Sequence, residues 1–300
     1  MTQIAKPIKR RKIKGDSGAG YAFIAVALVI FALFTAYPVL SALIISFQKY
    51  MPLGSKFIGF DNYIDSFKDP LFWKAIKNTV VYTLLTVPVA LFISLGVSLL
   101  ILPLKKKLQT VFKAIYYLPA VASGVALSVV WLWIFDPMPN GIFNQLLGYF
   151  GISNVNWLGA TSTSMFSLVL MSWLSSHGTS IIIYLAALLG IDDSYYEAAE
   201  LDGASFLKKL WYIVIPCLKP TTLFLLVTGV IGSFQVFQNA YLMTGGGPDN
   251  ATTMVGLLIF NNAFKYFEFG KAAAQSLILA LIIGGISLIQ FKFLGKDVEY

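Results

Sequence analysis

Charged residues are scarce in this sequence. Asp, Glu, Lys and Arg make up 12% of its 300 residues, whereas about 25% is usual for a soluble domain. Hydrophobic residues make up 57%, and the mean hydropathy is +0.75. A soluble domain could not bury so much apolar surface, so most of the chain is expected to lie in membrane lipid. The net charge of +8 comes from basic residues scattered between apolar blocks, which indicates membrane topology and argues against nucleic-acid binding.

Cysteine and histidine occur once each. Cys217 cannot form a disulfide within the chain and has no neighbours at metal-binding spacing. His177 alone cannot supply a two-histidine ligand set. An intramembrane enzyme would need paired catalytic groups, and the sequence has none. We therefore expect no catalytic residue, no metal site and no cofactor bound by this chain.

Windows without charge predict six membrane-spanning helices, because a charge at the bilayer centre costs about 2.5–3.5 kcal/mol. The segment from Pro137 to Ser164 is rich in Gly, Asn, Ser and Pro and is expected to lie outside the membrane. The first apolar run is too long for a signal peptide and lacks an A-x-A cleavage site, so it is expected to remain as a span. The expected class is an all-α polytopic membrane protein, with spans at about 21–47, 78–102, 114–135, 164–190, 220–240 and 272–291.

The distribution of Lys and Arg predicts the orientation of the chain. If the basic segment 1–20 is cytoplasmic, then 15 of the 22 Lys and Arg residues fall on the inner side and seven on the outer side. Both the N-terminal segment and the tail 293–300 are then cytoplasmic. The permease domain would extend over 21–292.

The inner loop 192–219, between the fourth and fifth spans, is not built like a linker. Ser194 and Glu197 match a capping box, which predicts a helix that starts there. The pair Asp202-Gly203 predicts a turn. A second helix with an apolar side is expected after the turn, ended by Pro216 and Pro220. The small alanines of the first helix would let another protein approach its backbone closely.

The same loop resembles the EAA loop of binding-protein-dependent ABC transporter permeases. Glu197-Ala198-Ala199, then Gly203, then Ile213-Val214-Ile215-Pro216 reproduce its frame, with Ile215 where leucine is usual. The longer string EAAELDGASFLKKLWYIVIPCLKP resembles the MalF-like sugar permeases, and the similarity runs from about residue 22 to 290. The resemblance implies a type I ABC importer permease fold. It also implies that the loop couples to an ATPase through Glu197, Ala198, Ala199, Asp202, Gly203, Ala204 and Pro216.

The family resemblance implies a set of partners. These are two copies of a cytoplasmic ATPase, which bind ATP and magnesium, a second permease of the MalG type, and an extracytoplasmic sugar-binding protein. The sequence itself has no G-x-x-x-x-G-K-[ST] phosphate loop, so the energy must come from another subunit. The chain would then be a transporter subunit in the inner membrane of a prokaryote, and not an enzyme.

Polar residues within the predicted spans are the candidates for the sugar pathway. An aromatic ring with amide and hydroxyl groups suits a sugar, and Gln235 and Asn239 would share one helix face. Hydrogen bonding between helices is the alternative role for such residues. The pathway candidates are Trp173, Ser176, Ser233, Gln235 and Asn239.

Two outer segments, 148–164 and 245–271, are candidates for docking the binding protein, although they could be plain connections. A channel or an ion-coupled carrier for small polar solutes is the alternative function. Such a carrier needs charged or ion-binding groups within the membrane, and no Asp, Glu, Lys or Arg falls within the predicted spans.

Overall fold

The computed structural model describes residues 17–50, 54–175 and 177–295. It is helical apart from two strands of two residues each, which pair antiparallel. The elements in chain order, with π-helical segments labelled η, are α1 (Ser17–Phe31), η1 (Ala32–Ala36), α2 (Tyr37–Ser46), β1 (Gln48–Lys49), β2 (Lys56–Phe57), α3 (Asp61–Lys68), α4 (Pro70–Ile101), α5 (Lys106–Val121), α6 (Gly124–Ile134), α7 (Ile142–Tyr149), α8 (Ser164–Leu174), α9 (Gly178–Leu189), α10 (Asp193–Leu201), α11 (Phe206–Lys209), η2 (Leu210–Val214), α12 (Ile215–Cys217), α13 (Lys219–Phe234), α14 (Gln238–Met243), α15 (Val255–Phe260), η3 (Asn261–Lys265) and α16 (Phe269–Leu294).

Within the described residues, three continuous helices are long and apolar enough to cross a membrane: Ile24–Ser46, α4 and α16. Three helix pairs qualify together although each pair is bent. The bends are 96° between α5 and α6, 43° between α8 and α9, and 65° between Phe206–Cys217 and α13. With each pair counted as one span, the total reaches six, so the predicted class of an all-helical polytopic membrane protein is confirmed.

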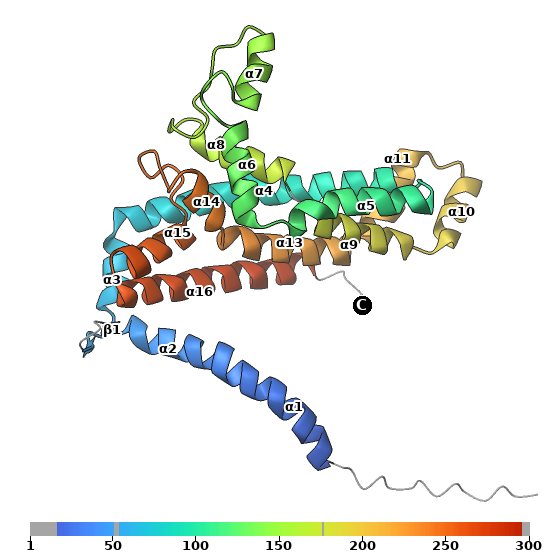
Figure 1. Ribbon diagram of the computed structural model, residues 1–300. Coiled ribbons are helices and arrows are strands. Elements are labelled where there is room, and N and C mark those ends of the chain that lie inside the picture. Colours follow the sequence, from blue (N-terminus) through green and yellow to red (C-terminus); the bar gives the residue numbers. More distant parts are fainter. Residues whose placement is uncertain (1–16, 51–53, 176, 296–300) are drawn as a thin grey trace, which may run out of the picture.

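Helix α4 is the central element of the bundle, and α8, α9 and α13 pack along it (Figure 1). Asp69 caps its start, because the carboxylate accepts a hydrogen bond from the Leu71 N–H at 2.9 Å, and Pro70 follows at the first helical position. Several hydroxyls within α4 donate to the carbonyl one turn earlier, as Thr79, Thr86 and Ser98 do. Local bonds of this kind let hydroxyl side chains lie within a membrane span.

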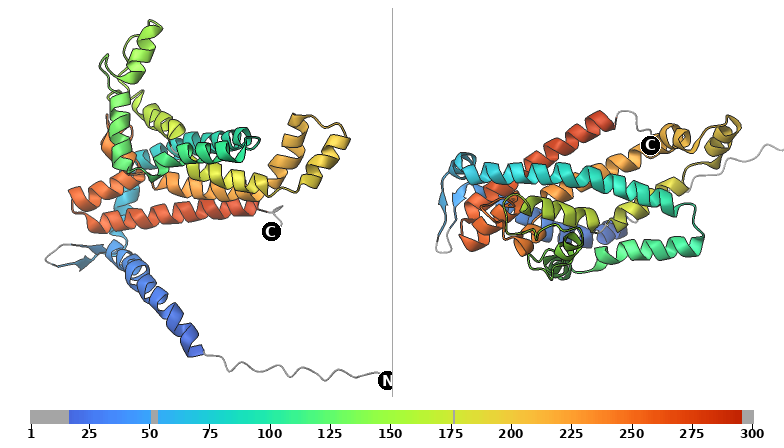
Figure 2. Two further views of the ribbon diagram at one scale, coloured as in Figure 1. Left: turned by 45° about the vertical axis from the view of Figure 1, so that its right-hand side comes forward. Right: turned by 90° about the horizontal axis from the view of Figure 1, so that it is seen from above.

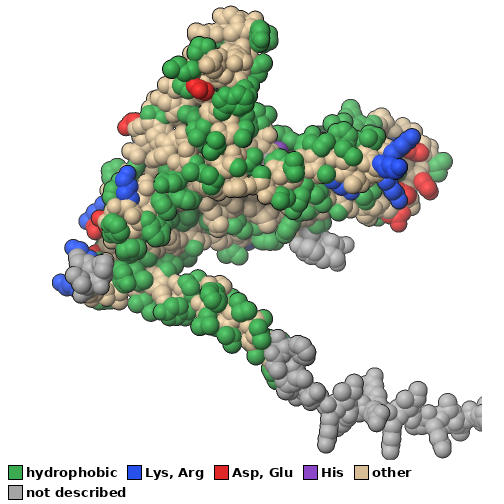
Figure 3. Space-filling view, in the orientation of Figure 1, with side chains coloured by type: hydrophobic (Ala, Val, Ile, Leu, Met, Phe, Trp, Pro, Cys, Tyr) green, Lys and Arg blue, Asp and Glu red, His purple; other side chains and the backbone are tan. Residues whose placement is uncertain are grey.

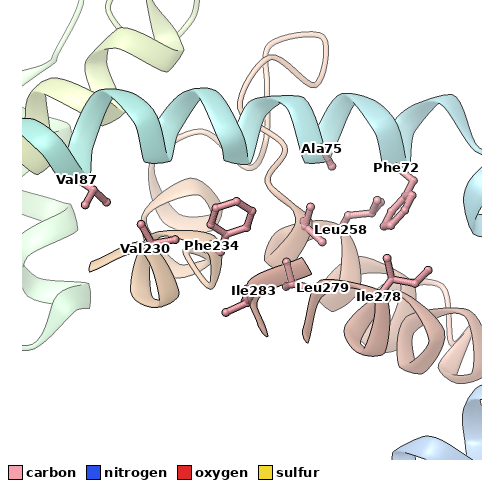
Figure 4. Close-up of a cluster of buried hydrophobic side chains, with 10 residues drawn as sticks. Phe72, Ala75, Val87, Val230, Phe234, Leu258, Ile278, Leu279 and Ile283 are labelled. Atoms are coloured by element: carbon pink, nitrogen blue, oxygen red, sulfur yellow. The ribbon is translucent and has the colours of Figure 1, made fainter. Parts of the chain in front are cut away.

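The largest part of the core lies where α4, α13, α15 and α16 meet. Phe72 and Val87 of α4 face Phe234 of α13 and Ile278 of α16 across this cluster (Figure 4). Phe72 is fully buried. A second cluster joins α4, α6, α8, α14 and α15, and a third joins α9, η2 and α13 near the loop 192–219.

The first span diverges from this bundle. Ile24–Ser46 leaves the bundle at its α2 end, where it meets α16, and α1 points away (Figures 1 and 2). The most apolar window of this span has no buried residue. A helix with an apolar surface all round needs lipid or another membrane protein around it.

Charged side chains gather towards the two ends of the bundle, and hydrophobic side chains cover the face between them (Figure 3). One end carries α3, β1 and the start of α16, and the opposite end carries α10 and α11 (Figure 1). This distribution suits a bundle that crosses a bilayer along its long axis.

Several helix ends differ from the expected boundaries. Helix α4 begins at Pro70, before the span expected from about residue 78, and its first turns carry Lys74 and Lys77. Within the expected fifth span, helix α13 ends at Phe234 and α14 begins at Gln238. Helix α15, inside the predicted outer segment 245–271, is largely buried through Val255, Leu257 and Leu258. The basic residues of segment 1–16 and the tail residues 296–300 lie outside the described residues.

Candidate functional site

A cavity of about 270 Å³ lies between α4, the break between α8 and α9, and α13. Its lining combines hydroxyl groups, one imidazole and small apolar groups. The lining residues are Tyr82, Thr86, Val87, Ala90, Leu91, Ser172, His177, Ser180, Leu225, Gly229, Gly232, Ser233 and Val236.

Tyr82 brings three helices together at this cavity. Its hydroxyl interacts with Ser172 of α8 and Asn239 of α14. Nearby, the Ser233 hydroxyl donates to the Thr83 hydroxyl oxygen at 2.9 Å, which joins α13 to α4. The polar part of the cavity wall therefore consists of hydroxyl groups and the His177 imidazole, and the Asn239 amide lies behind Tyr82.

The break in the fourth span places His177 in the cavity wall. Its Nε2 lies 2.8 Å from the Trp173 carbonyl oxygen. Because a carbonyl can only accept, Nε2 carries the proton in this contact. Gly178 begins α9 and packs against the backbone of Tyr116 and Tyr117 in α5, where a side chain would overlap the Tyr116 carbonyl oxygen. The lack of a side chain at Gly178 lets α9 approach α5 directly below the break.

The predicted pathway residues have different surroundings. Ser233 lines the cavity, and Asn239 reaches it through Tyr82. Trp173 is not among the lining residues: its indole N–H donates to the Leu85 carbonyl oxygen at 2.8 Å, which anchors α8 to α4. Ser176 lies outside the described residues.

The expectation that Gln235 and Asn239 share a helix face is wrong. Helix α13 ends at Phe234, and α14 begins at Gln238, so residues 235–237 connect two helices. Phe237 packs its ring 4.6 Å from that of Phe260, and Gly256 packs against the Val236 carbonyl oxygen. This tertiary packing fixes the break, and Gln235 is exposed there.

Sequence reasoning missed Tyr82, Thr86 and Ser180 as lining residues. A signal for the first two exists, since Thr79, Tyr82, Thr83 and Thr86 recur at helical spacing within a charge-free window. The same pattern also fits hydroxyls that bond within their own helix, as Thr79 and Thr86 do. Only the packed structure separates Tyr82, whose hydroxyl contacts other helices at the cavity, from Thr79, whose hydroxyl accepts from the Val255 N–H of α15 away from the cavity.

The loop 192–219 forms two helices at one end of the bundle, as expected, but the predicted capping box is wrong. Asp192 is the N-cap of α10, and its carboxylate accepts a hydrogen bond from the Ser194 N–H at 2.8 Å. The Ser194 hydroxyl and backbone N–H together hold the pKa of Asp192 below its usual value. The helix begins earlier than predicted because an aspartate is a strong N-cap and its charge suits the helix N-terminus.

The turn after α10 is held by two backbone hydrogen bonds. The Gly203 N–H donates to the Glu200 carbonyl at 3.0 Å, and the Ala204 N–H donates to the Ala199 carbonyl at 2.8 Å. These bonds form a Schellman motif, and Gly203 takes the required positive φ of 68°. The predicted turn at Asp202-Gly203 is therefore present.

The surface of α10 is largely exposed, and the charged residues on this helix are all acidic. Glu197, Ala198 and Asp202 are exposed, and Leu201 has 90% of its surface accessible. Glu200 pairs with Lys209 at 2.7 Å, and this hydrogen bond and the lysine charge lower the pKa of Glu200. An apolar side chain as exposed as Leu201, beside small and acidic residues, is a feature of a docking surface.

The second helix of the loop continues through Pro216 to Cys217, so Pro216 does not end it. The turn before α12 is the π-helical segment η2 (Leu210–Val214), in which the Ile215 N–H donates to the Leu210 carbonyl. A widened turn next to a proline moves the carbonyl that its ring would otherwise strike. The chain then bends by 65° into α13 at Leu218, which is buried.

The opposite end of the bundle carries a folded arm and a charged hollow. Asn144 of α7 organises the arm, since its amide bonds the backbone of Asp136, Pro137 and Val155 and accepts from the Trp157 indole. The hollow measures about 680 Å³ and is lined in part by Lys49, Asp65, Lys68 and Glu268.

Comparison with known protein families shows which family this chain belongs to. Residues 72–294 match the model of the binding-protein-dependent transport system inner membrane component. The chain belongs to this family. It is a multi-pass inner-membrane permease subunit of a binding-protein-dependent ABC transporter, which confirms the resemblance seen in the loop 192–219. Permeases of this family are not the catalytic subunits of their transporters, so neither catalysis nor a cofactor is expected of this chain.

Curated relatives match nearly the whole chain. The probable ABC transporter permease protein YesP of Bacillus subtilis is 36% identical over 299 residues, covering 97% of this chain and 95% of the relative. The arabinooligosaccharides transport system permease protein AraP of the same organism is 33% identical and covers 93% of this chain and 89% of its own. The lactose transport system permease protein LacF of Rhizobium radiobacter is 32% identical, covering 91% and 92%.

A solved structure supports the fold. A chain of a bacterial ABC transporter involved in the import of the acidic polysaccharide alginate superposes with a TM-score of 0.81 at 23% identity. The match covers 94% of this permease and 97% of that chain. The arrangement of broken and continuous helices is therefore a shared permease fold.

Proposed function

We propose that this permease forms half of the translocation pathway of an ATP-driven importer for uncharged sugars or oligosaccharides. The observation that carries the proposal is the cavity around Tyr82, Ser172 and Ser233. Its hydroxyl groups can bond the rim of a sugar, and the Tyr82 ring can stack on a C–H face of the sugar. Relatives named for arabinooligosaccharide and lactose transport support the substrate class.

The lack of carboxylate, ammonium and guanidinium groups in the cavity lining supports an uncharged substrate. None of the described lining residues is Asp, Glu, Lys or Arg, and an anionic substrate in a low-dielectric site would need a cationic partner. The same lack of carboxylates argues against an ion-coupled carrier or channel. At about 270 Å³ the cavity is slightly below the usual range of ligand pockets, which suits a site completed by a second permease.

The coupling role belongs to α10. In this proposal Glu197, Ala198, Ala199 and Leu201 enter a groove of the cytoplasmic ATPase, of which the transporter has two copies. A single permease with one coupling helix serves one ATPase copy, so a second permease, of the MalG type, serves the other. Asp202, Gly203, Ala204 and Pro216 shape the connection to the bundle. This end of the bundle, with both termini, is then cytoplasmic.

The opposite end would receive the sugar-loaded binding protein. The arm built on Asn144 and the hollow beside Lys68 and Glu268 offer a folded polar surface there. Trp173 supports the cavity indirectly, because its bond to Leu85 anchors α8 near Tyr82. Gln235, exposed at the helix break, would contact substrate on its way into the cavity.

Tyr82→Phe tests the cavity. The change removes the hydroxyl that meets Ser172 and Asn239 and keeps the ring. We expect uptake of sugar by the reconstituted complex to fall by about three- to tenfold, the equivalent of one hydrogen bond. ATPase activity stimulated by the loaded binding protein should remain. The matched control is Tyr184→Phe, since Tyr184 is equally buried and its hydroxyl bonds Thr222.

Uptake of neutral sugar by Tyr82→Phe at the wild-type rate would contradict the placement of the substrate. Preference for a uronate-bearing oligosaccharide over a neutral one of equal length would contradict the substrate class and leave the importer function standing.

A further inference from the structure

Helix α10 is attached to the bundle by few contacts. Tyr196 packs against the apolar cluster formed by Tyr184, Leu188 and Val214. The turn at Gly203 supplies only backbone hydrogen bonds, and a Cβ placed there would meet nothing within 4 Å. A helix joined through such an open turn can swing about it unless a side chain fixes the angle.

The ion pair between Glu200 and Lys209 bridges that turn. Glu200 is in the last turn of α10, and Lys209 is the last residue of α11. Their charged groups are 2.7 Å apart, and the lysine side chain is only 19% exposed, against 69% for the glutamate. The stem of Lys209 lines an apolar groove of about 520 Å³ with Phe206 and Leu210, and its ammonium extends to Glu200.

Lys209 also stands at the start of a continuous packed route to the cavity. The π-helical turn Leu210–Val214 follows it directly. Val214, Leu218 and Leu225 belong to one buried cluster, and Leu225 also lines the cavity. A displacement of the 206–217 helix would therefore reach the cavity wall through packed side chains.

We propose that Lys209 is a positioning residue for energy coupling: its ion pair with Glu200 locks α10 to the 206–217 helix. A push from the ATPase on α10 then moves α13 and the cavity wall. Without the pair, the same push bends the turn at Gly203. This inference rests on the proposed docking of α10 to the ATPase. It adds the residue through which movement of the docked helix is transmitted to α13.

Three variants of the reconstituted complex test the role of the ion pair between Glu200 and Lys209. Lys209→Met keeps the apolar stem and removes the charge, and the double change Glu200→Lys with Lys209→Glu restores a pair with reversed polarity. Lys208→Ala is the matched control, since it removes a charge next to Lys209 and leaves the ion pair intact. Lys208 is exposed.

We expect Lys209→Met to assemble with the ATPase and to lower the sugar imported per ATP hydrolysed by about two- to thirtyfold, the range found for residues that carry coupling. The double change should recover most of this ratio, and Lys208→Ala should match the wild type. A wild-type ratio in Lys209→Met, or no recovery in an assembled double variant, would overturn the proposal.

A distance measurement covers the case in which uptake is too low to measure. Spin labels at Tyr195 and Phe224, which are both exposed, report the angle between α10 and α13. We expect Lys209→Met to broaden the distance distribution and the double change to narrow it again. Distance distributions of equal width in all variants would overturn the proposed role of the ion pair. If the wild-type complex itself shows no ATP-driven uptake of any sugar, the proposed function fails instead.

Discussion

At the scale of single residues, some polar side chains in the spans bond only within their own helix, and others join two helices. Thr86 and Ser94 donate to carbonyls one turn back. Tyr82, Trp173 and Ser233 instead reach a neighbouring helix. Contacts of the second kind fix the cavity wall, because a hydroxyl or indole in lipid gains most from a partner on another helix.

A charged pair also joins two helices, at the end of the bundle opposite α10. The carboxylate of Asp69 caps α4 and accepts a hydrogen bond from Lys271 of α16 at 2.9 Å, with about a fifth of each side chain exposed. Partial burial raises the pKa of Asp69, but the hydrogen bond from Lys271 and those from the backbone outweigh it, so the pKa lies below its usual 3.8. The pair fastens the starts of two spans together.

We expect Asp69→Asn to keep the cap and lose the ion pair, with a loss of about 1 kcal/mol of stability at neutral pH. Asp69→Ala also removes the cap and should cost about 1 kcal/mol more. Since the folded pKa is lowered, the contribution of the carboxylate is present above pH 3.8 and is lost as the pH falls through the folded pKa. Thermal unfolding of the purified complex, measured from neutral pH down to about pH 3, checks this.

The control for that series is Asp65→Asn, an exposed carboxylate beside the same hollow. Its unfolding should follow the wild type at every pH. A gap between wild type and Asp69→Asn that does not narrow as the pH drops below 3.8 would contradict the role of the ion pair.

At the scale of elements, charge-free windows were enough to predict the number of spans, because the cost of burying charge is a local property of the sequence. The bends were not predictable in this way. The break at residues 235–237 depends on Phe260 and Gly256, which lie far along the chain. The cap of α10 was misplaced by a short distance because Asp192 and Ser194 are both good N-cap residues. Family resemblance identified the loop, and only the structure showed the ion pair from Glu200 to Lys209.

The contact of α9 with α5 gives an element-scale prediction. A Cβ at Gly178 would overlap the Tyr116 carbonyl oxygen and lie 2.6 Å from the Tyr117 Cα. Both are backbone atoms, so the helices must separate to accept it. We expect Gly178→Ala to destabilise the complex by about 1–3 kcal/mol, seen as a lower midpoint of thermal unfolding.

Gly190→Ala is the control at the other end of α9, where a Cβ would have only ordinary contacts, the nearest at 3.4 Å. It should change the midpoint little. Equal stability of the two alanine variants would show that α9 and α5 are not in close contact at Gly178.

At the scale of the whole molecule, the proposal assigns different partners to the two ends of the bundle. The end with α10 is the proposed cytoplasmic face, and the end with Asn250 is the proposed outer face. A single cysteine at Ser205 should resist a membrane-impermeant thiol reagent added outside intact cells, and one at Asn250 should react. Both positions are exposed, and the exposed Cys217 must first be replaced by serine. The reverse labelling pattern would overturn the orientation.

The central claim is that this permease takes its energy from a separate ATPase through α10. The direct measurement is copurification of the ATPase with the tagged permease from membranes, in the wild type and in Leu201→Asp, which places a charge on the most exposed apolar residue of α10. We expect the ATPase to copurify in stoichiometric amount with the wild type and to be lost from Leu201→Asp, while the second permease stays bound to both. A wild-type permease that is isolated without an ATPase, or a Leu201→Asp variant that retains the ATPase and imports sugar normally, would contradict the account.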